Sequence, residues 1–391
     1  MISVITSGSD DSGRDSPRRS KAFSFIFGLD YIQIIPAVAL LCLGLLYIYS
    51  TGQQEIGGDS GAWKRQLRYV LLGFCSWLFF AYVNYRNWKQ WALIAYAAAL
   101  TLLVFVLFFG QVRYHARRWF SVYGVFSVQP SEFAKLATIL FLAWIMSLRR
   151  FNPNKLSHFL GIGAVVAAPF ALIKLEPDLG TAMVLLPVAA AMIFVSRFKL
   201  KWVILLAIAA AVLVPAVYPF LRPYQKERIL VFLHPSRDPD GKGWNSRQSQ
   251  LAVGSGGTHG KGFMNSTQST LGFLPKTVAD SDFIFSVIAE ETGFVGSVSV
   301  ILCYFLIIFS SFKAAAMAKD PFGRYLAVGI GTLIFAHSAV NIGMTIRLVP
   351  VTGLPLPLVS KGGTFVVSMM SALGLLQSIH IHNKGDSDSS D

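Results

Sequence analysis

Long apolar runs separated by short polar segments fill most of the chain. A run of about 20 apolar residues is long enough to cross a bilayer as a helix. The pattern predicts ten membrane-spanning helices, at about residues 30–50, 67–85, 91–109, 130–147, 157–174, 181–196, 202–219, 284–311, 324–345 and 364–381. The sixth and seventh are the least clearly separated, because only three basic residues divide them. The predicted fold is therefore all-α, a polytopic membrane protein with one bundle of about ten helices.

Composition supports this fold class. Charged residues make up 14% of the chain and hydrophobic residues 54%, whereas a soluble protein has about 25% charged residues. So few charges cannot cover a surface that faces water on all sides. Cys42, Cys75 and Cys303 all fall within apolar runs, so the sequence predicts no disulfide framework.

Polar tails flank the predicted membrane domain, which covers residues 23–382. Residues 1–22 are too polar to pack and lack the pattern of a signal peptide, so we expect a disordered tail there and a second tail at 383–391. Basic residues in short turns mark the cytoplasmic side. The turns on the side of both tails carry Arg86, Lys89, Arg149, Arg150, Lys155, Arg197, Lys199, Lys201, Lys313, Lys319 and Arg324. Both termini are therefore predicted to be cytoplasmic.

The opposite side carries an unusual positive charge. The net charge is +14, and about half of the 34 Lys and Arg residues fall on the outward side. Basic residues at a membrane surface favour anionic lipid or another anionic ligand on that face, and no nucleic-acid partner is expected. The longest interruption, residues 220–281, lies on this side and is too long for a passive connector.

A glycine-rich run within that interruption, residues 254–262, has two interpretations. With Lys261 it could wrap phosphate oxygens with backbone N–H groups, or it could be a purely structural turn. It is not a nucleotide-binding P-loop, because Ser255 occupies the position of the first glycine and Gly262 follows the lysine.

Charged residues in or near the spans are candidates for function, because charge inside a membrane is costly. Glu132 and Lys135 fall one turn apart on one helix face, as a structural or regulatory pair or as functional groups. Glu290 and Glu291 lie in the first turns of the eighth span, with the same two alternatives.

Two further groups lie at predicted outer turns. Arg117, Arg118 and Trp119 suit a lipid phosphate and its headgroup, or they are ordinary interfacial residues. Glu176 and Asp178 flank a proline and could meet a cation, an arginine or a sugar.

Asp282 stands where the eighth span begins. Partial burial raises the pKa of a carboxyl, which makes it a better base near neutral pH; the alternative is a helix N-cap. The seven histidines and three cysteines show no metal-ligand spacing, and no nicotinamide or flavin fingerprint is present. No organic cofactor is therefore expected.

Ordered motifs from about residue 30 to 381 resemble the RodA/FtsW/SpoVE family, the shape, elongation, division and sporulation (SEDS) proteins. The resemblance is carried by residues 118–119, 129–132, 176–181, 238–269, 282–285, 289–293 and 341–363. The sequence of residues 177–181, Pro-Asp-Leu-Gly-Thr, and that of the long loop are more similar to the elongation branch than to the division branch.

The resemblance implies a ten-helix peptidoglycan glycosyltransferase of the bacterial inner membrane. It would polymerise lipid II and lipid-linked glycan, with a class B penicillin-binding protein as transpeptidase and with membrane proteins of the elongation complex. A divalent cation, Mg or Mn, is implied, with unknown ligands. The essential aspartate of the family falls on Asp282, which favours the base over the helix cap.

This chain departs from the family pattern at three places. Between Pro275 and Asp282 the resemblance implies four residues beginning with Glu, whereas this chain has the six residues 276–281, beginning with Lys. The insertion leaves Asp280 as a rival base. Lys361 replaces a usual Tyr, and Ser266 a frequent Gly.

The expected reaction inverts the donor sugar in one displacement, which needs one base and a stabilised leaving group. Asp282 is the predicted base. The predicted substrate-binding residues are Arg117, Arg118, Trp119, Arg228, Lys261, Gln268, Ser269 and Asp178. The alternatives are a lipid II flippase or other transporter, a division-type polymerase, and a scaffold that only recruits a transpeptidase.

Overall fold

A bundle of long helices dominates the structure, a computed structural model that describes residues 28–53, 61–113, 116–122, 126–196, 219, 223–234, 238, 241–274 and 276–385. The long helices are α2 (Tyr31–Gln53), α3 (Ala62–Tyr82), α4 (Trp88–Phe109), α5 (Pro130–Met146), α6 (Leu156–Leu175), α7 (Leu179–Val195), α13 (Ile284–Met317), α14 (Pro321–Thr345) and α15 (Gly363–Gly385). A short 3-10 turn, η1 (Tyr85–Asn87), precedes α4.

These helices confirm the all-α, polytopic fold. Within the described ranges, nine of the ten predicted spans coincide with a helix, and the span predicted at 202–219 lies outside the described residues except for residue 219. Six of the helices in these ranges are long and apolar enough to cross a membrane, and α7 is a shorter apolar helix. The tail predicted at 1–22 and residues 386–391 also lie outside the description, whereas residues 383–385 belong to α15.

Helices α14 and α15 form the centre of the bundle, with most of their side chains buried. Small residues bring α15 close to α3: a Cβ on Gly374 would lie 2.5 Å from the carbonyl oxygen of Trp77. Helices α4 and α13, in contrast, expose large apolar side chains such as Phe108 and Phe305. Apolar surface of this kind is stable where it faces lipid.

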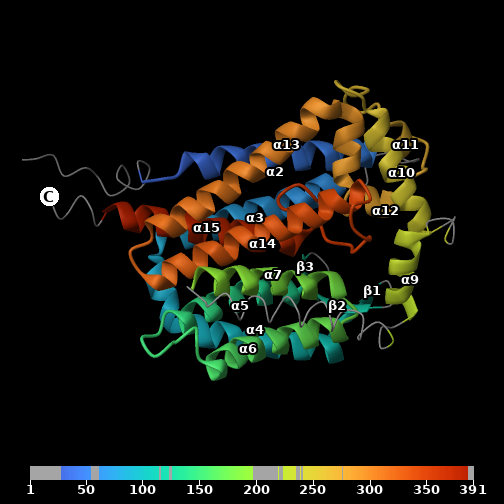
Figure 1. Cartoon of the computed structure of the whole chain (residues 1–391). Helices are drawn as coiled ribbons and strands as arrows, with labels where there is room; N and C mark the ends of the chain where they lie inside the picture. Colours follow the sequence, from blue (N-terminus) through green and yellow to red (C-terminus); the bar gives the residue numbers. More distant parts are fainter. Residues whose placement is uncertain are drawn as a thin grey trace, which may run out of the picture.

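The polar elements gather at one end of the bundle (Figure 1). They are α9 (Pro223–Leu233), α10 (Lys242–Ser255), α11 (Thr267–Thr270) and α12 (Lys276–Ala279), with the strands β1 (Gln111–Arg113), β2 (Ala116–Val122) and β3 (Phe126–Val128). We call this the loop end. The first residues of α2 and the last of α15 lie at the other end, where the backbone N–H of Asp30 donates to Gln377 Oε1 at 3.0 Å.

Sequence analysis did not predict the small sheet. The three strands form an antiparallel sheet in the order β1-β2-β3, in which Phe120 pairs with Val128 and Arg117 with Val112. Aromatic and β-branched residues favour this conformation, but the strands are too short to give a clear alternation. The sheet matters for function because it carries the candidate arginines.

Helix α13 breaks at Gly293, whose φ of 69° and ψ of −158° are not helical. The glycine-rich run 254–262 packs against the break, where the backbone N–H of Lys261 donates to the carbonyl of Glu290 at 3.0 Å. A Cβ on Gly293 would lie 2.3 Å from the backbone nitrogen of Gly260. The run therefore satisfies backbone groups that the broken helix exposes. This arrangement favours the structural interpretation of the run over the phosphate-wrapping one.

Candidate functional site

Asp282 lies in the turn between α12 and α13, at the loop end. Asn341 on α14 donates from Nδ2 to the carbonyl of Asp282 at 2.9 Å and to that of Leu354 at 2.7 Å. The N-cap position of α13 is occupied by Phe283, so Asp282 lies one residue before the cap. The bundle holds the backbone carbonyl of Asp282 through Asn341.

The Asp282 carboxylate faces the segment that precedes α15. A Cβ on Gly353 would lie 3.4 Å from Asp282 Oδ2. Beside it, Arg228 on α9 donates from Nη1 to the carbonyl of Thr352 at 3.0 Å. The structure thus brings together two residues that the sequence singled out, Asp282 and Arg228, from segments about fifty residues apart.

Burial raises the pKa of Asp282 to about 6. The positive charge of Arg228 opposes this rise, and the negative charges of Asp178 and Asp280 add to it. The residue as a whole is partly buried. A carboxylate with a pKa near 6 is deprotonated at neutral pH and still basic enough to accept a proton from a reacting hydroxyl.

Asp280, the rival base, is part of an ion pair. Its Oδ2 lies 2.6 Å from Lys361 Nζ, and its side chain is largely buried. Burial raises the pKa of Asp280, while the charge of Lys361 and that of Arg65 lower it. A carboxylate held by a lysine is a weaker proton acceptor than one without such a partner, so the geometry favours Asp282 as the base.

Arg118 is held by the turn between α6 and α7. Its Nε donates to the carbonyl of Glu176 at 2.9 Å, Nη2 donates to the carbonyl of Pro177, and Nη1 lies 3.4 Å from Asp178 Oδ2. Asp178 also caps α7, because its Oδ1 accepts from the backbone N–H of Thr181 at 3.2 Å. Arg118 and Asp178 therefore fix this turn, and their binding of substrate stays a prediction.

Arg117 does not join Arg118 at the turn between α6 and α7. The pairing of β1 with β2 shifts register beside Arg118, because Gln111 pairs with Trp119 and the next residue, Val112, with Arg117. Arg117 donates from Nη1 to the carbonyl of Phe108 at the end of α4, at 3.0 Å. The two arginines are neighbours in sequence, but they contact different helix ends.

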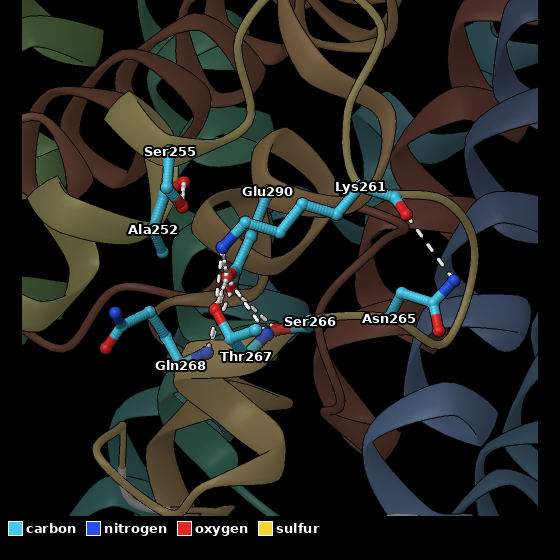
Figure 2. Close-up of polar contacts among 8 residues, drawn as sticks. All are labelled: Ala252, Ser255, Lys261, Asn265, Ser266, Thr267, Gln268 and Glu290. Carbon is cyan, nitrogen blue, oxygen red and sulfur yellow. Dashed lines mark hydrogen bonds and ion pairs between the residues drawn. The ribbon is translucent and has the colours of Figure 1, made fainter.

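Glu290 gathers the donors of the long loop, as Figure 2 shows. Its Oε1 accepts from Lys261 Nζ at 2.6 Å and from Thr267 Oγ1 at 2.7 Å, and its Oε2 accepts from Ser266 Oγ at 2.6 Å. The backbone N–H of Gln268 also approaches Oε1, at 3.3 Å. The ammonium of Lys261 is thus committed to a glutamate, and its contact with a diphosphate stays a prediction.

Glu291 anchors the loop at a second point. Its Oε1 accepts from Ser50 Oγ on α2 and its Oε2 from the backbone N–H of Met264, both at 2.9 Å. Together with Glu290 it joins the loop to α13 and α2, in line with the structural role expected of the two glutamates. The side chain of Ser269, a predicted substrate contact, lies outside the description.

Glu132 and Lys135 form the ion pair that their spacing indicated, deep in α5. Glu132 Oε2 lies 2.9 Å from Lys135 Nζ, and both side chains are buried. His337 on α14 completes the group, with its Nε2 2.8 Å from Lys135 Nζ. Sequence reasoning missed His337, although an ionisable residue within a predicted span was a sufficient signal.

A divalent cation finds no ready site among the described residues. They contain no group of three or more His, Cys, Asp or Glu side chains that could hold a metal ion. Asp178 and Asp280, the carboxylates that act on Asp282, are each paired with a basic side chain. The described residues therefore do not fit the implied cation, and we derive no step through one.

Comparisons with known proteins agree with this architecture. The FtsW/RodA/SpoVE model, described as cell cycle protein, matches residues 31–385. Peptidoglycan glycosyltransferase MrdB of Escherichia coli is 36% identical over 372 residues, which cover 95% of this chain and 98% of the relative. Peptidoglycan glycosyltransferase RodA of Treponema pallidum is 30% identical over 426 residues, which cover 90% and 97%.

A solved structure is similar along the same length. That structure is of a peptidoglycan synthase complex that coordinates polymerization and crosslinking, and one of its chains aligns with this one with a TM-score of 0.78 and 30% identity. The alignment covers 91% of this chain and 98% of that one. From the family match and the two relatives, we conclude that this chain belongs to the FtsW/RodA/SpoVE family of multi-pass membrane proteins.

Proposed function

We propose that this chain is a peptidoglycan glycosyltransferase that polymerises lipid II into glycan strands, with Asp282 as the general base. Relatives in Escherichia coli and Treponema pallidum carry the name of that enzyme class. One observation carries the proposal for the site: a partly buried carboxylate with a pKa of about 6 lies at the loop end beside an arginine. That is the environment a base needs near neutral pH.

In the proposed reaction Asp282 accepts the proton of the C4 hydroxyl on the GlcNAc of lipid II. The freed oxygen forms a bond to C1 of the MurNAc at the end of the growing strand. The bond from C1 to the diphosphate oxygen breaks with its electron pair, and undecaprenyl diphosphate leaves as an anion. Displacement from the opposite face converts an α-linked donor into a β-1,4 product.

The leaving diphosphate needs positive charge nearby. Arg228 is the basic residue that acts most strongly on Asp282, and its guanidinium lies at the segment 352–353 that faces the carboxylate. We assign it the first contact with the diphosphate. The undecaprenyl tails of both substrates would stay in the bilayer beside the helix bundle, so both substrates can reach the site from the membrane.

The proposal extends to place and partners. The chain would lie in the bacterial inner membrane with both termini in the cytoplasm, act in cell elongation, and work beside a class B penicillin-binding protein and other membrane proteins of the elongation complex. Its similarity to a chain from a complex of polymerization and crosslinking supports such a transpeptidase partner. The loop end, opposite the first residues of α2 and the last residues of α15, would then face the periplasm.

A polymerisation assay tests the function. Purified protein in detergent, alone and with its transpeptidase, is incubated with labelled lipid II and the glycan products are separated by length. A flippase or a scaffold makes no polymer under these conditions. Asp282→Asn should reduce the rate by about 10²–10⁴-fold, the usual value of general-base catalysis.

The pH profile provides the second part of this test. A base must be deprotonated, so the rate should rise as pH increases through about 6, the pKa of Asp282. Asp280→Asn tests the rival base: Asp282 is kept, so this variant should retain more activity than Asp282→Asn and still show a rising limb of the pH profile. If Asp280→Asn made no polymer while Asp282→Asn stayed active, the base would be Asp280 and our assignment would be wrong.

A further inference from the structure

Lys361, in the segment before α15, reaches across the loop end to the turn that carries Asp282. Its Nζ lies 2.6 Å from Asp280 Oδ2, and its backbone N–H donates to the carbonyl of the same residue at 2.9 Å. Next to it, Ser360 Oγ donates to the carbonyl of Ser281 at 2.5 Å. Three bonds from two consecutive residues therefore hold the two residues that precede the base.

The ion pair also places a positive charge next to the turn that carries the base. Asp280 lies two residues before Asp282. A carboxylate two residues before a base adds negative charge next to it. The lysine supplies a compensating charge and a second tether at the same time.

Several charged groups act on this turn. Arg228 on α9 and Asp178 before α7 act on Asp282 directly, together with Asp280. Arg65 on α3 and Lys361 act on Asp280. Because Lys361 is both bonded to Asp280 and the larger of the two positive influences on it, it controls how much uncompensated negative charge the base experiences.

We propose that the Lys361–Asp280 ion pair is a positioning device for the base: it fixes the turn that presents the Asp282 carboxylate and neutralises the charge beside it. This inference rests on the proposed function, in which Asp282 accepts the proton. Neither residue of the pair needs to touch substrate. The pair acts through its two bonds to the turn.

The test compares steady-state polymerisation by the full-length protein over a range of pH. Lys361→Met keeps the length of the side chain but removes its charge, so the side-chain tether is lost and the Asp280 charge is left uncompensated. We expect kcat to fall about 10- to 100-fold, the effect of a small misplacement of a reacting group, with little change in KM. The rising limb of the pH profile should move up by about one pH unit.

Three variants separate positioning from charge. Lys361→Arg keeps the charge and should retain most of kcat and the parent pH midpoint. Lys361→Met combined with Asp280→Asn removes both charges, so the midpoint should return while kcat stays low. Lys319→Met, which removes an exposed lysine at the opposite end of the bundle, should match the parent in both.

A normal kcat with an unshifted midpoint in Lys361→Met would overturn the proposal, and so would a loss of kcat that Lys319→Met shares. Failure of the proposed function is distinguishable, because then the parent protein makes no polymer or Asp282→Asn remains active. Thermal melting of each variant in detergent shows that the compared proteins are folded.

Discussion

Glu176, in the turn between α6 and α7, is a buried carboxyl whose charge the fold does not compensate. Its side chain is 1% exposed, and within the described part of the chain neither of its oxygens has a hydrogen-bond partner. Burial raises its pKa to about 9; the Asp178 charge adds to the rise and the Arg118 charge opposes it. At neutral pH Glu176 is therefore protonated in the folded protein and ionised in the unfolded chain.

The size of the effect follows from this difference. An ordinary glutamate has a pKa of 4.5, and each unit of difference is worth about 1.4 kcal/mol. Because the folded-state pKa is the raised one, stability is lost as pH rises from about 4.5 towards about 9. Protonating Glu176 on folding therefore lowers the free energy of unfolding by about 3 kcal/mol at pH 7 and by about 1 kcal/mol at pH 5. Glu176→Gln keeps the shape and removes this cost.

We therefore expect Glu176→Gln to be more stable than the parent protein, by about 3 kcal/mol at pH 7 and about 1 kcal/mol at pH 5. The thermal unfolding midpoint in detergent, measured at both pH values, checks this. Glu227→Gln, which changes an exposed glutamate on α9, is the control and should leave the midpoint unchanged. The reasoning is refuted if Glu176→Gln lowers the midpoint, or raises it equally at both pH values.

Two further predictions concern the break in α13 and the ion pair within α5. Gly293→Ala places a Cβ at a positive φ, 2.3 Å from the backbone nitrogen of Gly260, so it should destabilise the protein by at least about 1–3 kcal/mol and expose the loop to protease. Gly161→Ala, on α6 with open space around it, is the control and should change neither. Equal rates of digestion in the two variants would contradict the prediction. Lys135→Met leaves Glu132 buried without its partner and should cost about 3–5 kcal/mol. Adding Glu132→Gln should recover much of that loss in the melting midpoint, and simple addition of two losses would argue against the pair.

The spans could be predicted from the sequence because length and apolar content decide them locally. The ends of the spans could not be predicted where a polar residue is buried by a partner that is distant in the sequence. Helix α3 begins at Ala62, five residues before its predicted start, and includes Gln66. That side chain donates from Nε2 to the carbonyl of Ser360 at 3.3 Å and accepts from the backbone N–H of Gly362 at 3.2 Å. A polar residue that looks like loop in the sequence is thus part of the bundle.

The candidate site was predictable in its residue types more than in its contacts. The sequence singled out Asp282, Arg118 and Lys261 as charged groups at outer turns. It could not indicate that Arg118 would bind carbonyls 58 and 59 residues away, or that Lys261 would pair with Glu290. Such partners depend on which turns the helices bring together, and the spacing of residues along a chain does not contain that information.

Asp282 owes its position to the membrane bundle more than to the long loop. The segment 350–361 contacts each element of the site: the carbonyl of Thr352 accepts from Arg228, Gly353 lies beside the carboxylate, and Lys361 holds the turn before it. Prolines at 350, 355 and 357 limit the freedom of this segment, and irregular backbone of this kind is stable at a bundle end only where protein surrounds it. The middle of the long loop, around residues 261–268, is held at Glu290 and Glu291 instead. The segment before α15 therefore positions the base, while the break in α13 positions the middle of the long loop.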